Sequence, residues 1–118
     1  MIQLKRVYEA PDSRDGRRFL VERLWPRGMK KADLAMEAWL KDAAPSTALR
    51  QWFGHDPARW EEFRQRYAAE LENNPAAVLP LLDAVRQGTV TLLYSAHDQE
   101  HNSALLLKGF LEGRLKEK

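Results

Sequence analysis

The feature that most constrains the fold is the near-continuous apolar run Thr89–Tyr94, TVTLLY. Such a run with β-branched residues is typical of a central strand of a parallel sheet, covered on both faces. A second strand is expected at Arg18–Trp25, because Phe19–Val21 contains good strand formers. The weakly alternating segment Ile2–Tyr8 is expected to form the first strand. These three segments predict a small, largely parallel sheet.

The segments between and after these strands carry helical signals. Asp56-Pro57 is a strong start signal, because Asp caps a helix and Pro suits its first turn. The apolar residues that follow it recur at helical spacing. The expected helices are Asp33–Asp42, Thr47–Phe53, one from Asp56 to Asn73, one from Pro75 to Gly88, and a last one capped by Asp98. The pattern predicts an α/β fold, a single domain over residues 1–118, with about five helices covering the sheet.

Composition narrows the function classes. The 118 residues contain no cysteine, which excludes disulfides, thiolate catalysis and Cys-based metal sites. No apolar run approaches the ~20 residues of a membrane span, so no membrane partner is expected. The first ten residues lack the apolar core of a signal peptide, and a cytoplasmic location is expected. No cofactor is predicted.

Basic residues crowd the first quarter of the chain, although the net charge is only +2. One interpretation is an ordinary solvated face. The other is a positive rim that attracts an anion. The residues concerned are Lys5, Arg6, Arg14, Arg17, Arg18, Arg23, Arg27, Lys30 and Lys31.

Polar residues follow two of the expected strands at their carboxyl ends, where α/β sheets collect ligands. One segment is Arg23–Gly28, and the other is Tyr94–Asp98, which leads into the last helix and its free N–H groups. Together they predict a pocket for a phosphate or carboxylate. The candidate ligand-binding residues are Arg23, Trp25, Arg27, Gly28, Tyr94, Ser95 and Asn102, with Asp98 as a candidate catalytic residue. Alternatively, Asp98 only caps the helix, and the arginines pair with it and with Glu22.

Histidines offer two further hypotheses. His55 beside Asp56 suggests a general base with an orienting carboxylate, which makes His55 the second candidate catalytic residue. However, Asp56 is also wanted as a helix cap, and a purely structural His55 is the alternative. His97 and His101 are four residues apart, but no third metal ligand is evident, so no metal site is predicted.

Four motifs resemble the YeaO-like branch of a bacterial family, the domain of unknown function 488 group. They cover nearly the whole chain: RLWPRG (residues 23–28), EAWLKDAAPS (37–46), LRQWFGHDPARWEEFRQRY (49–67) and VTLLYSAHDQEHNSALLL (90–107). The resemblance implies a small cytoplasmic α/β protein and no established activity. In the wider group the third strand ends in a Cys, and Cys-His-Arg opens the next helix. Here Tyr94 stands in place of the first Cys, and Asn102–Ala104 replaces the rest, so thiol chemistry does not apply.

The sequence leaves three functions open, and with them whether the chain is an enzyme at all. The first is a small enzyme or binding domain with an anion pocket, in which Arg23 and Arg27 converge near Asp98. The second is a nucleic-acid-binding accessory protein that uses the basic first quarter, with Trp25 or Trp52 stacking on bases. The third is a protein-interaction module built on Trp and Arg. Oligomeric state is not predicted.

Overall fold

Four parallel strands form one sheet in the order β1-β4-β2-β3 in the computed structural model, which describes residues 1–116. The strands are β1 (Ile2–Arg6), β2 (Arg17–Leu20), β3 (Ala38–Trp39) and β4 (Val90–Tyr94). All five residues of β4 are buried, and the strand lies between β1 and β2. The expectation of a central strand in a parallel sheet is therefore confirmed.

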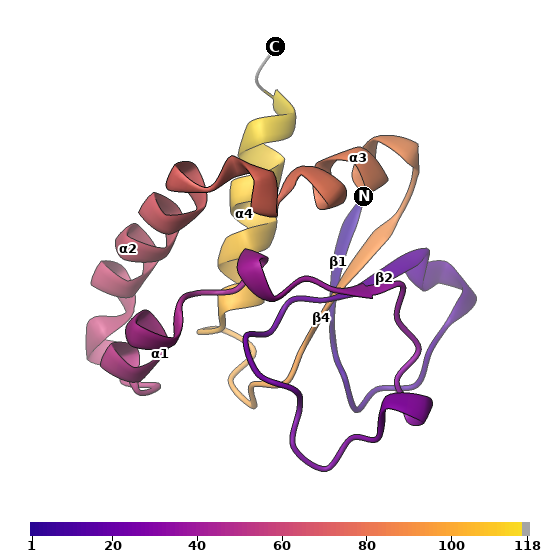
Figure 1. Ribbon diagram of the computed structural model, residues 1–118, viewed down its shortest axis with the longest axis horizontal. Coiled ribbons are helices and arrows are strands. Elements are labelled where there is room, and N and C mark those ends of the chain that lie inside the picture. Colours follow the sequence, from indigo (N-terminus) through magenta and orange to yellow (C-terminus); the bar gives the residue numbers. More distant parts are fainter. Residues whose placement is uncertain (117–118) are drawn as a thin grey trace.

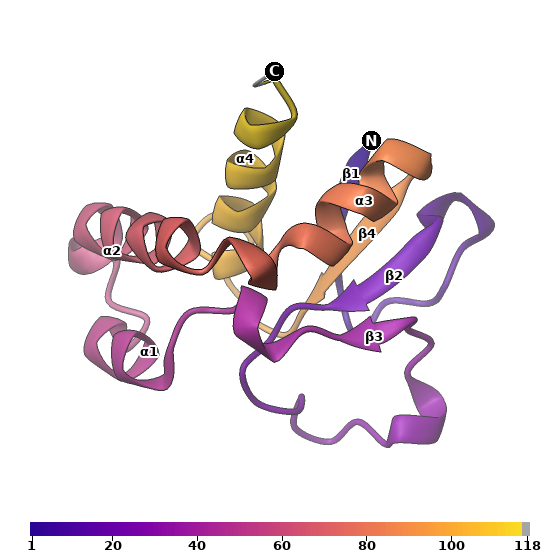
Figure 2. The same ribbon diagram turned by 45° about the horizontal axis from the view of Figure 1, so that its top comes forward.

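The helices of the described chain are α1 (Thr47–Phe53), α2 (Trp60–Asn73), α3 (Leu79–Gln87) and α4 (Ser103–Lys116). They gather on one side of the sheet, and the segment before β3 lies on the other side (Figures 1 and 2). That segment fills a second small core, in which Leu20 and Leu93 of the sheet meet Leu34, Trp25 and Met36. Helices thus cover one face of the sheet, and a loop covers the other.

The prediction of a helix over Asp33–Asp42 is wrong, and about five helices become four in residues 1–116. Two short 3-10 turns occupy Lys31–Asp33 and Lys41–Ala43, with β3 between them. The open edge of β2 explains this outcome, because the N–H of Glu37 donates to the Arg18 carbonyl at 2.6 Å. The Leu40 N–H likewise donates to the Leu20 carbonyl at 2.8 Å. Unpaired strand groups override a weak local helix preference.

Helix α1 is held at both ends as its sequence suggests. The Ser46 hydroxyl accepts a hydrogen bond from the Leu49 N–H at 3.1 Å, and Gly54 follows as the C-cap. Glu70 of α2 then accepts from the Ser46 N–H at 2.9 Å and from its hydroxyl at 2.6 Å. These bonds tie the start of α1, the helix that carries Arg50, to α2.

Aromatic packing joins α1 to α2. Phe53 and Phe63 stack with their ring centroids 4.3 Å apart, and both are buried. Tyr67, one turn further along α2, donates its hydroxyl to the Ala43 carbonyl at 2.5 Å. The expected inward face of α2 is confirmed at Phe63, Tyr67 and Leu71, which are all buried. None of the helices in the described residues is both long and apolar enough to cross a membrane.

A buried ionic cluster lies where the β1–β2 connection crosses the sheet. The Asp15 carboxylate is 3% exposed and accepts hydrogen bonds from Lys5 at 3.1 Å and from Arg18 at 2.5 Å. Burial on its own raises the pKa of Asp15. The bonds from Lys5, the Asp12 N–H and Arg18 outweigh burial and hold this pKa below its ordinary value. Lys5 and Arg18, two of the basic residues that were candidates for a positive rim, are therefore paired within this cluster.

Candidate functional site

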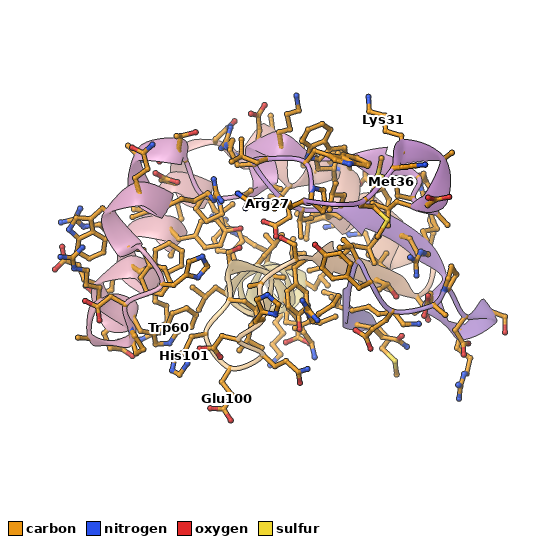
Figure 3. All side chains as sticks on the ribbon, turned by 90° about the horizontal axis from the view of Figure 1, so that it is seen from below. Arg27, Lys31, Met36, Trp60, Glu100 and His101 are labelled. Atoms are coloured by element: carbon orange, nitrogen blue, oxygen red, sulfur yellow. The ribbon has the colours of Figure 1, made fainter. Side chains whose placement is uncertain are left out.

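A pocket of about 660 Å³ opens at the carboxyl ends of β1, β2 and β4. Figure 3 views the molecule from that side, with Arg27 near the centre of the view and His101 beside Trp60. The strand ends contribute Tyr8, Glu22, Arg27 and the segment 94–98. The helical side contributes Arg50, Phe53, His55 and Phe63, together with residues 101–103 before and at the start of α4. Two segments that the sequence analysis singled out thus border one cavity.

Glu22 ties the ends of β2 and β4 together. One of its carboxylate oxygens, Oε1, accepts from the Ser95 N–H at 2.8 Å and from the Ser95 hydroxyl at 2.6 Å. Arg6 supports the same turn, because its Nε donates to the Ala96 carbonyl at 2.9 Å. The alternative in which Glu22 pairs with an arginine is therefore wrong within residues 1–116. Sequence reasoning did not include Glu22 in the site, although it directly follows an apolar strand.

Arg27 and Arg50 differ from the other arginines in the described part of the chain. Each of the others donates to a carboxylate, a carbonyl or an amide, or lies in a cation–π or other side-chain contact. The guanidinium groups of Arg27 and Arg50 form no hydrogen bond or ion pair with residues 1–116, and both line the pocket. An unpaired guanidinium keeps its full donor capacity for a ligand. Arg50 was missed because helix α1 shows no strand-end signal.

Arg27 is held by its backbone, which leaves its side chain available. The Tyr8 hydroxyl donates to the Arg27 carbonyl at 3.0 Å. The Met29 N–H donates to the Pro26 carbonyl at 3.4 Å, which closes a turn with Gly28 at φ 78°. A positive φ at this turn position favours glycine. The predicted ligand-binding role of Gly28 thus becomes a turn role, since Gly28 does not line the pocket.

Tyr94, the last residue of β4, lines the pocket. Its side chain is buried, and burial raises the pKa of its phenol above the ordinary value. The hydroxyl forms no hydrogen bond with residues 1–116. Because every fully buried side-chain polar atom described here has a partner, this hydroxyl is reached by solvent, and Tyr94 is one of the residues that line the pocket.

Asp98 does not cap the last helix, contrary to the expectation. Its carboxylate accepts from the Glu100 N–H at 2.9 Å and from the His101 N–H at 3.0 Å, within a turn before α4. These backbone bonds, the Glu100 one foremost, lower the pKa of Asp98, and the His101 side chain adds to the effect. Asn102 caps α4 instead, because its Oδ1 accepts from the Leu105 N–H at 2.8 Å. Both residues still line the pocket.

His55 lines the pocket without an orienting carboxylate. Asp56 accepts from the Ala58 N–H at 3.0 Å and lies 3.8 Å from Arg59, so it serves the start of the next helical segment. The His55 ring forms no hydrogen bond with the described residues, and its backbone is left-handed at φ 57°. The structure thus brings His55 to the site but not as half of a base–carboxylate pair. Residues 1–116 contain no group of three or more side chains that could hold a metal ion.

Arg23 and Trp25 lie outside the pocket, although the sequence places them in the same segment as Arg27. Arg23 donates to the Ala44 carbonyl at 3.0 Å and to the Pro45 carbonyl at 3.2 Å. Trp25 packs edge-on against Trp39 at 5.3 Å, and its ring N–H donates to the Met29 carbonyl at 2.5 Å. The two side chains stabilise the loop that carries Arg27.

The two arginines of this loop should therefore respond differently to substitution. Arg23→Ala is expected to lower the free energy of unfolding by about 1–3 kcal/mol, because two carbonyls near the core lose their donors. Arg27→Ala is expected to change it by less than about 0.5 kcal/mol, as for an exposed side chain without partners. Urea unfolding followed by tryptophan fluorescence measures both values. Equal losses in the two variants would contradict these assignments.

Comparison with known proteins places the chain in a family. A family model described as the inactive DUF488-N3 subclade matches residues 1–118. The uncharacterized protein YeaO of Escherichia coli (strain K12) is 44% identical over 110 residues, which cover 93% of this chain and 96% of YeaO. The uncharacterized protein Rv3073c of Mycobacterium tuberculosis (strain ATCC 25618 / H37Rv) is 39% identical over 113 residues, with 96% and 95% coverage. No solved structure matches the chain at a significant level. The chain belongs to the DUF488 family, in its YeaO-like, inactive N3 subclade.

Proposed function

We propose that this protein binds a small anionic ligand, with Arg27 and Arg50 as the anion-holding residues of the pocket. The observation that carries the proposal is that these two unpaired guanidinium groups line one cavity. Because the other arginines have partners within the described residues, these two guanidinium groups are the ones that keep all their donors for a ligand. Backbone N–H groups at the start of α4, beside Ser103, add further donors for an anion.

Binding is a better-supported role than catalysis. The chain has no cysteine, and His55 has no carboxylate to orient it. Burial raises the pKa of Tyr94, which disfavours a phenolate base, and Asp98 is occupied by N–H donors. The matching family model is itself described as inactive. These features favour a binding protein, and an enzyme acting on a phosphorylated or acidic small molecule is the second form of the hypothesis.

The nucleic-acid alternative has less support. Lys5 and Arg18 pair with Asp15, and Arg17 pairs with Glu37, so much of the basic first quarter is neutralised. The Trp52 ring already contacts two arginines, with the guanidinium groups of Arg59 and Arg66 5.4 Å and 4.3 Å from its centroid, which leaves it less free to stack on bases. The protein-interaction alternative rests on few exposed apolar side chains, since the large ones in the described chain are Met1, Tyr8, Leu24, Leu79 and Leu105.

Titration with inorganic phosphate tests the proposal. Arg27→Gln and Arg50→Gln are each expected to weaken phosphate binding about tenfold or more, since each removes a charge-assisted hydrogen-bond donor. Isothermal titration calorimetry at low ionic strength measures the affinities. Arg86→Gln is the matched control, because Arg86 is exposed, pairs with Asp83 on α3 and does not line the pocket. A wild-type protein that binds no phosphate, or variants that bind it like the control, would refute the anion site.

A further inference from the structure

The pocket contains an open acceptor in addition to the two guanidinium groups. Oε1 of Glu22 is occupied by Ser95, but Oε2 forms no hydrogen bond with residues 1–116. Every fully buried polar side-chain atom in that part of the chain has a partner, so Oε2 is reached by solvent, and Glu22 is one of the residues that line the pocket. A carboxylate oxygen held in this way accepts hydrogen bonds and repels a second anion. A ligand that fits beside Oε2 of Glu22 therefore carries a hydrogen-bond donor.

The other pocket carboxylate does not share this property. Asp98 already accepts from two backbone N–H groups, and its Oδ2 lies 3.0 Å from Nδ1 of His101. The open polar atoms of the pocket thus include the guanidinium groups of Arg27 and Arg50, Oε2 of Glu22 and the Tyr94 hydroxyl, with the His55 ring as a further group that has no hydrogen bond within residues 1–116. The first two are donors only, Glu22 is an acceptor only, and the tyrosine hydroxyl is both.

The wall between these polar atoms is apolar. Phe53 and Phe63 line the pocket as a buried stacked pair. The pocket volume of about 660 Å³ falls within the roughly 300–1,000 Å³ of sites for small organic molecules, and it far exceeds the space needed by one phosphate ion. The cavity is suited to a carbon skeleton as well as an anion.

We propose that the pocket takes an organic phosphate that also carries a hydrogen-bond donor, either a hydroxyl or an ammonium group. The phosphate lies against Arg27 and Arg50, and the donor reaches Glu22 and Tyr94. A phosphate suits two guanidinium groups better than a carboxylate does, because it offers three oxygens and up to two charges. This inference rests on the proposed anion site and adds the second end of the ligand.

The test compares three probes on the wild-type protein by calorimetry: inorganic phosphate, ribose 5-phosphate and O-phosphoethanolamine. At least one organic phosphate is expected to bind about tenfold more tightly than inorganic phosphate, the gain typical of one hydrogen bond to a charged group. Tighter binding of ribose 5-phosphate identifies a hydroxyl donor, and tighter binding of O-phosphoethanolamine identifies an ammonium donor. Equal affinity for all three probes would refute the donor contact with Glu22 and Tyr94 but would not contradict the anion site at Arg27 and Arg50. Failure of all three to bind overturns the anion site itself.

Glu22→Gln is the decisive variant. Its amide oxygen still accepts from Ser95, but the second acceptor becomes a donor. The organic phosphates are expected to lose about tenfold in affinity, and inorganic phosphate is expected to bind as before or more tightly. A parallel loss for inorganic phosphate would overturn the assignment of Glu22. Tyr94→Phe, which keeps the buried ring, is a second variant expected to weaken the organic phosphates selectively, and its failure to do so removes Tyr94 from the donor end.

Discussion

Asp15→Ala is expected to lower the free energy of unfolding by about 3–5 kcal/mol, the cost typical of removing one partner from a buried ion pair. Arg18 is only 8% exposed, and its guanidinium would keep a single bond, from Nε to the Ala35 carbonyl at 2.7 Å. Lys5 would lose its carboxylate as well. Such a loss is a large share of the roughly 5–15 kcal/mol that stabilises an ordinary domain.

Urea unfolding at neutral pH measures this loss. Glu61→Ala is the control, because Glu61 forms an exposed ion pair with Arg64 at 2.9 Å. A surface pair of this kind contributes less than about 1 kcal/mol. A similar small effect of Asp15→Ala would show that the cluster does not stabilise the fold.

The free energy of unfolding of the wild type and that of Asp15→Ala should depend differently on pH in the acid range. The pKa of Asp15 is lowered in the folded state, so its contribution to stability is complete above the ordinary Asp value of about 3.9 and is lost as the pH falls through the lower folded value. The stability difference between wild type and Asp15→Ala is therefore expected to shrink below about pH 4. A difference that stays constant down to the acid transition would contradict this linkage.

Gly16→Ala is expected to lower the free energy of unfolding by about 2–5 kcal/mol, because it combines a left-handed backbone with a steric clash. Gly16 has φ 64°, and a Cβ at this position would lie 2.2 Å from the Thr89 carbonyl oxygen. That oxygen already accepts from the Arg17 N–H at 3.1 Å, where β2 begins beside β4. The backbone therefore has to move, and the start of the central strand pairing moves with it.

Gly28→Ala measures the cost of the positive φ without the cost of a steric clash. Gly28 has a similar φ of 78°, but nothing lies within 4 Å of a Cβ built on it. The Gly28→Ala variant is expected to lose about 1 kcal/mol of its free energy of unfolding, the cost of the left-handed conformation alone. Thermal and urea unfolding of both variants give the comparison. Equal losses would mean that the contact with Thr89 relaxes without cost.

Elements with strong local signals were predictable. The apolar run of β4 and the capped helix α1, with Ser46 before it and Gly54 after it, formed where the pattern indicated. Weak local signals gave way to long-range pairing. Residues Ala38–Trp39 form a strand because the open edge of β2 needs partners, and α4 begins at Ser103 because Asn102, and not Asp98, is placed to cap it.

The segment Arg23–Gly28 illustrates why a site is harder to predict than a strand. Its charge pattern pointed correctly to a carboxyl edge of the sheet, yet Arg23 turns to the carbonyls of Ala44 and Pro45, and only Arg27 reaches the pocket. Arg50 lies in one of the family motifs and Glu22 follows an apolar strand, but neither position indicates in the sequence whether its charge is paired. Their significance comes from what does, or does not, lie within hydrogen-bond distance of them.

The sequence by itself determined the α/β class, the absence of thiol chemistry and the edge at which polar residues gather, because composition and hydrophobic period are local properties and buried apolar runs are typical of parallel strands. Tertiary structure alone decided which charges are satisfied. Arg17 pairs with Glu37, twenty positions later in the chain, whereas Arg27 and Arg50, which are also far apart in the chain, line one cavity without partners. Pairing of charges depends on distances of a few ångströms between remote segments, and folding sets those distances.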